Sequence, residues 1–145
     1  MSGHLLTELR RGSVLDTRDM LATLLTTTEY YGDWLRDADQ SIVAGDFNNS
    51  VIWDKGNKES NFYQTNQKLE SLGFFSSYHS TQAEAFGSEA ASTLFHTKNE
   101  LKPYHIDYLY LKGLKADDVE IGSYRDWISY SDHMPFIVDC ENDHP

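Results

Sequence analysis

Residues 104–111 read Tyr-His-Ile-Asp-Tyr-Leu-Tyr-Leu, and this stretch decides the fold. Its aromatic and aliphatic residues, with no Gly or Pro among them, are typical of a β-strand. The alternation places His105, Asp107 and Leu109 on one face of that strand. A carboxylate within an otherwise apolar strand is costly to bury without a partner, so Asp107 is expected to pair with a cation, and an imidazolium is well suited. The alternative is an edge strand with Asp107 in solvent.

Upstream, Gly45-Asp46-Phe47-Asn48 follows the apolar run 41–44. That run predicts a buried strand, which puts Asp46 and Asn48 at its C-terminal edge and, if the chain stays extended, on one face. A carboxylate and a carboxamide so placed can hold and orient a water molecule, and the carboxylate can accept its proton. The same four residues also favour a turn, and taken alone the turn is the simpler interpretation.

Downstream, Ser131-Asp132-His133-Met134-Pro135 leads into an apolar stretch that predicts the last strand. Ser131 can brace the turn. If Asp107 holds His133, the imidazole is charged and can neutralise a phosphate oxygen. Asp132 can ligate Mg²⁺ or Mn²⁺, because both ions prefer oxygen ligands. In isolation, Ser-Asp-His is more often a turn than a site.

The rest of the chain predicts a layered α/β unit in which helices cover one face of a sheet. Apolar residues at helical spacing predict one helix over 16–37 and a second over 64–72, which Gly73 ends. The polar stretches 49–61 and 79–92 are predicted to be loops. Residues 1–12 show no pattern and are expected to form a mobile end. The expected strands are 41–44, 74–78, 93–96, 104–111, 119–122 and 134–140.

Length and composition fit one domain: the chain has 145 residues, of which 39% are hydrophobic. No stretch approaches the ~20 apolar residues of a membrane span and no leader sequence is visible, so we expect a cytoplasmic protein. The single Cys140 excludes an internal disulfide. The net charge of −11 argues against tight, non-specific binding of duplex nucleic acid. It does not forbid a phosphate ester as substrate, because a bound divalent cation inverts the local field.

Taken together and in this order, the Gly-Asp-Phe-Asn, Ile-Asp-Tyr and Ser-Asp-His-Met-Pro blocks resemble the endonuclease/exonuclease/phosphatase superfamily, which has the DNase-I-like fold. The resemblance covers about residues 31–139. It implies half of a four-layer α/β sandwich, with one mostly antiparallel or mixed sheet and two main helices on one face. It also implies hydrolysis of a phosphate ester, nuclease-like and of phosphodiester type, with Mg²⁺ or Mn²⁺ as cofactor.

The resemblance implies a role for each polar residue of the three blocks. Asp46 would activate the attacking water, and Asn48 would orient it or contact the phosphate. Asp107 would fix and charge His133, which would stabilise the phosphorane. Asp132 would assist the metal or the leaving group.

Two further histidines are candidate substrate-binding residues. His105, on the predicted face of Asp107, either contacts substrate or packs in the core, and packing is slightly favoured. His79 begins the predicted loop 79–92, where members of the superfamily vary in substrate choice. A plain surface histidine is the simpler interpretation of His79.

The superfamily's main metal ligand is a Glu in the N-terminal half, and no strand before Asp46 carries one. We therefore expect a single partial domain over 1–145 that lacks the N-terminal half and exposes an apolar sheet face. A complementing N-terminal half or a second copy of the chain could cover that face. A non-catalytic interaction or remnant module that keeps the family strands is the alternative function. The substrate stays open between DNA, RNA, inositol phosphates and phospholipids.

Overall fold

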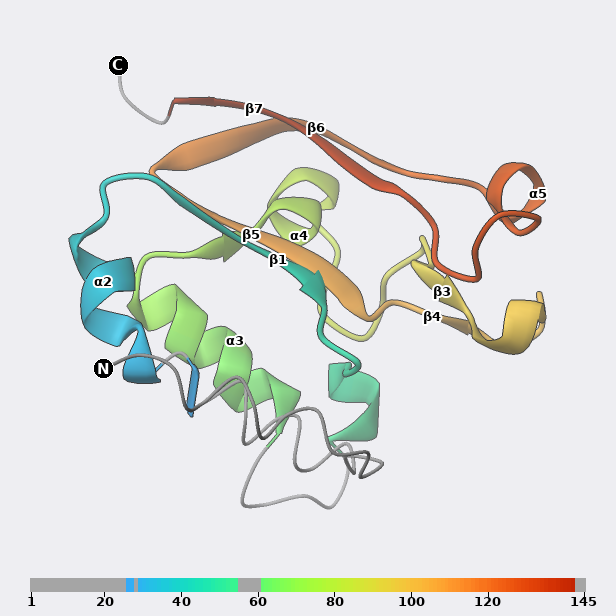
Figure 1. The fold of residues 1–145 in the computed structure, drawn as a ribbon, viewed down its shortest axis with the longest axis horizontal. Coiled ribbons are helices and arrows are strands. Elements are labelled where there is room, and N and C mark those ends of the chain that lie inside the picture. Colours follow the sequence, from blue (N-terminus) through green and yellow to red (C-terminus); the bar gives the residue numbers. More distant parts are fainter. Residues whose placement is uncertain (1–25, 28, 55–60, 143–145) are drawn as a thin grey trace, which may run out of the picture.

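The computed structural model describes residues 26–27, 29–54 and 61–142 (Figure 1). The predicted mobile end at 1–12 and most of the first predicted helix lie outside these residues. The described elements are α2 (Gly32–Asp37), β1 (Ser41–Asp46), the 3-10 helix η2 (Val51–Trp53), α3 (Phe62–Ser71), β2 (Phe75–Ser76), α4 (Ser77–Gln82), β3 (Leu94–Phe95), the 3-10 helix η3 (His96–Lys98), β4 (Pro103–Tyr104), β5 (Asp107–Lys112), β6 (Leu114–Ile121), α5 (Tyr124–Trp127) and β7 (Phe136–Asn142).

Strand β5 is the centre of the largest sheet, as Figure 1 shows. It pairs antiparallel with β1 on one side and with β2 on the other. Strands β3 and β4 form a short antiparallel pair, and β6 and β7 form a long one. The predicted α/β class with mainly antiparallel pairing is therefore confirmed.

The hydrophobic core lies between α3 and one face of this sheet. Tyr108 and Tyr110 of β5 are 2% and 1% exposed, and Phe62 and Leu69 of α3 are fully buried. Phe47, directly after β1, contacts the rings of Phe62, Tyr108 and Tyr110. Aromatic side chains contribute large buried areas, so this cluster anchors the ends of β1 and β5 against the helix.

Helix α3 begins two residues earlier than the apolar pattern predicts, because two side chains cap it. The carboxylate of Asp54 accepts hydrogen bonds from the amides of Phe62 and Tyr63 at 2.8 and 2.9 Å. The Asn61 side chain accepts one from the amide of Gln64 at 2.8 Å. These amides have no partner within the helix, so the caps set its start. The predicted end at Gly73 is confirmed, with φ +87°.

Gly113 lets the chain pass from β5 into β6. Its φ of +64° lies in the left-handed region. A Cβ atom at this position would lie 2.0 Å from the carbonyl oxygen of Asp39. Only glycine fits this turn, from which β6 runs back toward the other end of the molecule (Figure 1).

Two predicted strands are wrong in detail. The strand over 74–78 is reduced to β2, and the chain enters α4 at Ser77, inside the stretch predicted to be strand. The carbonyl of Ser77 then accepts hydrogen bonds from the hydroxyls of Ser80 and Thr81. The strand over 104–111 is broken between β4 and β5. The physical cause of this break is the buried hydroxyl of Thr93, which accepts from the amides of Ile106 and Asp107.

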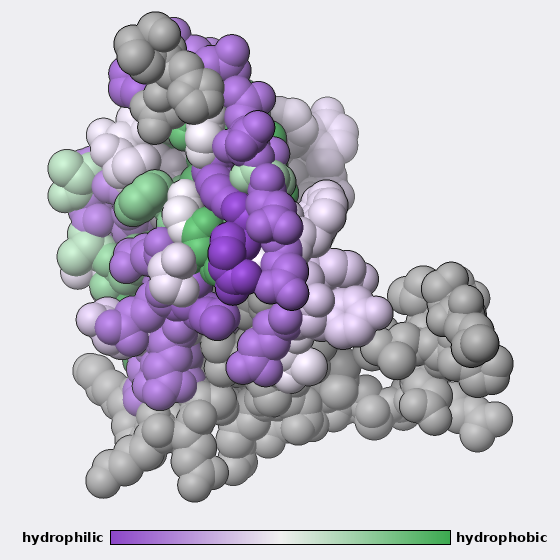
Figure 2. Space-filling view, turned by 90° about the vertical axis from the view of Figure 1, so that its left-hand side faces the viewer, coloured by the Kyte–Doolittle hydropathy of each residue, from purple (hydrophilic) through white to green (hydrophobic). Residues whose placement is uncertain are grey.

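The predicted apolar sheet face is partly present. Ile42 and Phe75 both pair with Leu111 across the sheet, so all three lie on one face. Leu111 is buried, whereas Ile42 and Phe75 are 54% and 62% exposed. On the side of the molecule drawn in Figure 2, hydrophobic areas are small and lie among hydrophilic ones. None of the described helices is long and apolar enough to cross a membrane.

Candidate active site

Two carboxylates face each other where β1 ends and β5 begins. Asp46 is the last residue of β1 and Asp107 the first of β5, and the two are direct partners in the antiparallel register. The ladder continues past them, because the amide of Phe47 donates to the carbonyl of Ile106 at 2.9 Å. Paired residues of antiparallel strands present their side chains on the same face. The register therefore brings two acidic groups together from residues 61 positions apart.

Asn48 holds the carboxylate of Asp46 from both sides. Its backbone amide donates to Asp46 Oδ1 at 2.7 Å, and its side-chain Nδ2 donates to Asp46 Oδ2 at 2.9 Å. Asn48 has φ +48°, a left-handed conformation that Asn tolerates better than most residues. The Gly-Asp-Phe-Asn block thus forms a turn and at the same time fixes an acidic group. The two interpretations of the sequence are compatible.

His133 completes the group from the segment between α5 and β7. Its Nδ1 lies 3.0 and 3.2 Å from the two carboxylate oxygens of Asp107, the imidazole partner that the sequence predicted. Its amide donates to the Ser131 hydroxyl at 3.0 Å, which is the predicted brace. Because Nδ1 is used by Asp107, Nε2 is the ring atom left to meet a substrate.

One ligand atom each from Asp46, Asp107 and His133 lies within 4.8 Å of the others. This is the single such group of three or more His, Cys, Asp or Glu residues in the part of the chain that the structure describes. Partial burial raises the pKa of Asp46; hydrogen bonds from Asn48 oppose this rise and the charge of Asp107 adds to it. A cluster with two carboxylates and one imidazole matches the donor types that Mn²⁺ and Mg²⁺ accept.

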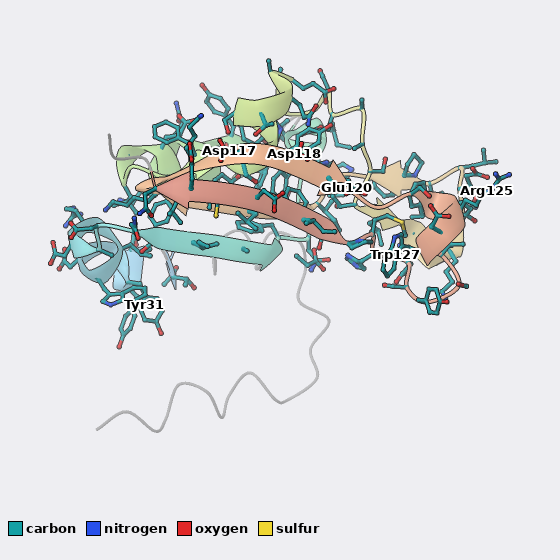
Figure 3. The ribbon with its side chains drawn as sticks, turned by 90° about the horizontal axis from the view of Figure 1, so that it is seen from above. Tyr31, Asp117, Asp118, Glu120, Arg125 and Trp127 are labelled. Atoms are coloured by element: carbon teal, nitrogen blue, oxygen red, sulfur yellow. The ribbon has the colours of Figure 1, made fainter. Side chains whose placement is uncertain are left out.

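Other acidic side chains lie apart from this cluster. Asp117, Asp118 and Glu120 project from β6 (Figure 3). Asp132, the predicted metal ligand, is half-buried beside His133 and is not one of the three clustered residues. Its backbone carbonyl accepts from the amide of Phe95 at 2.8 Å. The role of the Asp132 side chain stays a prediction.

The two substrate-binding candidates lie in the interior. His105 is 5% exposed, and its Nδ1 lies 2.9 Å from the carbonyl of Ala91. The side chain of His79 is 8% exposed and bridges Ser76 Oγ and Glu89. The interpretation of His79 as a surface residue is therefore wrong, because a buried carboxylate draws its ring inward. Packing, the favoured interpretation of His105, agrees with this burial.

Two residues at the centre of these contacts, Glu89 and Thr93, could not be identified from the sequence pattern. Glu89, within the predicted polar loop 79–92, has a side chain only 4% exposed. Thr93 is fully buried, and its hydroxyl accepts from the amides of Ile106 and Asp107, each at 3.0 Å. A threonine at the start of a predicted strand is ordinary, so only the three-dimensional arrangement reveals it.

Comparisons with known proteins identify the fold. No family model matches the chain, and no curated protein matches it by sequence. Among solved structures, the 3′ phosphatase NExo from Neisseria, bound to a product DNA hairpin, is similar with a TM-score of 0.61 and 20% identity, over 81% of this chain and 51% of that one. The 3′-5′ exonuclease NExo from Neisseria meningitidis is similar with a TM-score of 0.58 and 23% identity, over 83% and 52%.

The chain has the DNase-I-like fold. It spans about half the length of the two solved chains to which it is similar. The DNase-I-like fold, predicted from three short blocks of sequence, is thereby confirmed.

Proposed function

We propose that this chain supplies one half of the active site of a metal-dependent phosphoesterase of the nuclease type. The observation that carries the proposal is the convergence of Asp46, Asp107 and His133 at one end of the β1–β5 pair, within a DNase-I-like fold. Three blocks far apart in the sequence supply these residues. In this proposal Asp46 is the acid–base group, Asp107 orients the imidazole of His133, and the two carboxylates hold a cation.

Asp46 is the general base. Its carboxylate is held by the two hydrogen bonds from Asn48, so it faces the reacting phosphate in one orientation. Burial raises the pKa of Asp46 in the chain without a cation, and in this proposal Asp46 takes the proton of the attacking water. Asn48 keeps its side-chain oxygen for the water or the substrate, because its nitrogen is used by Asp46.

His133 stabilises the charge that develops on phosphorus. Asp107 contacts Nδ1, which fixes the ring, and Nε2 is then oriented to donate to a non-bridging phosphate oxygen. The His133 side chain is 36% exposed, so a phosphate can reach it, whereas Asp107 is 19% exposed. In this proposal Asp132, which directly precedes His133 in the chain, assists the metal or the leaving group.

A divalent cation, Mg²⁺ or Mn²⁺, is the cofactor of this proposal. Asp46 and Asp107 would hold it, with Asp132 as a further ligand, since Mg²⁺ and Mn²⁺ prefer oxygen donors. When bound, the cation neutralises phosphate charge and acts as a Lewis acid. The two adjacent carboxylates are consistent with this, because a cation between them relieves their mutual repulsion.

A further segment or chain completes the site. The similar structures are about twice as long as the aligned part, and Ile42 and Phe75 leave apolar surface at the margins of the sheet. A complementing N-terminal half covers this surface and brings the Glu ligand that no predicted strand before Asp46 carries. We place the assembled protein in the cytoplasm.

A phosphate ester in nucleic acid is the proposed substrate, since one similar protein is a 3′ phosphatase bound to a DNA hairpin product. The test is hydrolysis by the native-length protein of four substrates: a 3′-phosphorylated DNA hairpin, single-stranded RNA, an inositol phosphate and a phospholipid head group. Mg²⁺-dependent hydrolysis of the nucleic acids, lost in Asp46→Asn, supports the proposal. No hydrolysis of any substrate leaves the interaction module as the function of the chain.

A further inference from the structure

Thr93 lies between the chain segment that carries Asp107 and the segment that carries His133. It directly precedes β3 and is fully buried. Its amide donates to the carbonyl of Tyr104 at 2.9 Å, and its carbonyl accepts from the amide of Met134 at 2.7 Å. Its hydroxyl accepts from two amides, Ile106 and Asp107, each at 3.0 Å. One residue thus has hydrogen bonds both to the segment of Asp107 and to that of His133.

The hydroxyl bonds explain why the strand predicted over 104–111 is broken. At Tyr104 the chain pairs with β3, and from Asp107 onward it pairs with β1. The amides of Ile106 and Asp107 lie at this switch between partners. Buried amides need an acceptor, and the Thr93 hydroxyl offers two lone pairs. The side chain therefore takes the place of a missing strand and fixes the backbone of Asp107 where β5 begins.

The backbone around Thr93 fixes the other partner. Leu94 forms an isolated antiparallel bridge with His133, and the amide of Phe95 donates to the carbonyl of Asp132 at 2.8 Å. With the bond from Met134 to Thr93, three consecutive residues hold the segment 132–134 as a short strand partner. The backbone segments that carry Asp107 and His133 therefore flank residues 93–95, and their side chains meet at 3.0 Å.

We propose that Thr93 is a positioning residue for the Asp107–His133 pair, and that its hydroxyl sets the contact between the carboxylate and Nδ1. It touches neither substrate nor the reacting atoms. The inference rests on the proposed function, because it assigns Thr93 a role in aligning that site. A ring displaced by about 1 Å costs on the order of 100-fold in rate in aligned active sites. The rate therefore depends on the backbone that holds Asp107 and His133 in contact.

The test compares Thr93→Val, which keeps the shape and removes the acceptor, with Thr93→Ser, which keeps the acceptor and loses a methyl group. The first readout is the NMR signal of the His133 Nδ1 proton in the metal-free chain without substrate. We expect Thr93→Val and Asp107→Asn to weaken or lose this signal, and Thr93→Ser to retain it. A wild-type signal in Thr93→Val, or its loss in Thr93→Ser to the same degree, would overturn the proposal.

Kinetics on the native-length protein provide the second readout. Thr93→Val is expected to lower kcat by about 10- to 100-fold with little change in KM, and Thr93→Ser to restore most of it. Equal losses in both variants would indicate a merely structural role. The NMR measurement does not require hydrolytic activity. If the NMR signal depends on Thr93 but the protein hydrolyses no substrate, the proposed function is refuted and the positioning role of Thr93 stands.

A third measurement covers the case in which Thr93→Val does not fold. Hydrogen exchange at the amides of Ile106 and Asp107 is followed in the unmodified chain and in Thr93→Ser. Slow exchange in both is expected, because the buried hydroxyl protects these amides. Exchange as fast as in an exposed loop would show that the hydroxyl does not hold them, and the proposal would be wrong.

Discussion

Asp46 and Asp107 are cross-strand partners, so the β1–β5 ladder sets two carboxylates side by side at the candidate site. Like charges opposite one another destabilise a sheet. Burial raises the pKa of Asp46, and although the hydrogen bonds from Asn48 act against it, the pKa stays above the ordinary value. Such a pair is retained at a cost in stability, which is common where groups serve chemistry rather than folding.

Replacing Asp46 with Asn is expected to abolish activity. A general base contributes about 10²- to 10⁴-fold in rate. The raised pKa means that the charged form of Asp46 opposes folding at neutral pH, and that this opposition is relieved as the pH falls from the folded-state pKa to the unfolded one. The free energy of unfolding of the unmodified protein, taken relative to that of Asp46→Asn, should therefore rise as the pH falls, and urea unfolding measures this.

Asp132→Asn is the control, because Asp132 is a neighbouring carboxylate outside the cluster of three. Its stability shows the effect of an aspartate-to-asparagine substitution beside the cluster. A difference in the free energy of unfolding between Asp46→Asn and the unmodified protein that does not change with pH would contradict an Asp46 charge that opposes folding.

Asp107→Asn and His133→Ala should act as a unit. Each alone is expected to lower kcat by about 10²- to 10³-fold, because one removes the group that orients the ring and the other the ring itself. The double variant should then be no worse than the more damaging single one. Measured kcat values for the two single variants and the double variant decide this. Losses that multiply would show that the 3.0 Å contact carries no functional coupling.

The candidate site was more predictable than the connections around it. Asp107 sits in an apolar strand, so its need for a polar partner could be inferred from residues 104–111 alone, and the imidazole of His133 contacts it. The break between β4 and β5 could not, because it depends on the hydroxyl of Thr93, which the alternation of side chains does not reveal. The alternation of side chains indicates which residues are buried. The point at which a strand changes its pairing partner depends on tertiary contacts instead.

The region around His79 shows the same limit. Aromatic and serine residues over 74–78 favour a strand, yet α4 forms from Ser77 because Tyr78 and His79 bury their polar ends against acids further along the chain. The hydroxyl of Tyr78 donates to Glu84 at 2.7 Å, and His79 lies 3.0 Å from Glu89. No residue spacing indicates that a loop of this polarity folds into the interior.

Acid should destabilise the protein through Glu89 and His105. Burial raises the pKa of Glu89, but hydrogen bonds from His79 and Gly87 outweigh it and leave this pKa lowered. Stability from Glu89 is therefore present above its unfolded pKa and is lost as the pH falls through the lowered value. Burial lowers the pKa of His105, so its contribution begins to fall below about pH 6.5, where the unfolded chain takes up the proton.

Glu89→Gln tests the first of these contributions. It keeps the shape and removes the charge, so it should cost about 1–3 kcal/mol at neutral pH, the usual range for a hydrogen bond to a charged group. Thermal unfolding between pH 7 and pH 4 should show a weaker pH dependence than in the unmodified protein. A variant with unchanged stability at pH 7 would show that the buried pair is not stabilising.

The cap on α3 gives a prediction away from the site. Asp54→Ala removes the acceptor of two amides at the start of the helix, which should cost about 1–2 kcal/mol. Asp54→Asn keeps an acceptor and should cost less. Urea unfolding monitored by circular dichroism measures both. Equal effects of the two substitutions would show that charge, rather than the hydrogen bonds, sets this helix start.

The most direct test of the central claim is hydrolysis of a phosphodiester by the native-length protein, measured with Mg²⁺, with a chelator in place of Mg²⁺, and with the Asp46→Asn variant. The account predicts turnover that requires the cation and falls by at least about 10²-fold in the variant. Turnover that persists unchanged in Asp46→Asn, or equally in the chelator, would show that the cluster of Asp46, Asp107 and His133 is not the active site.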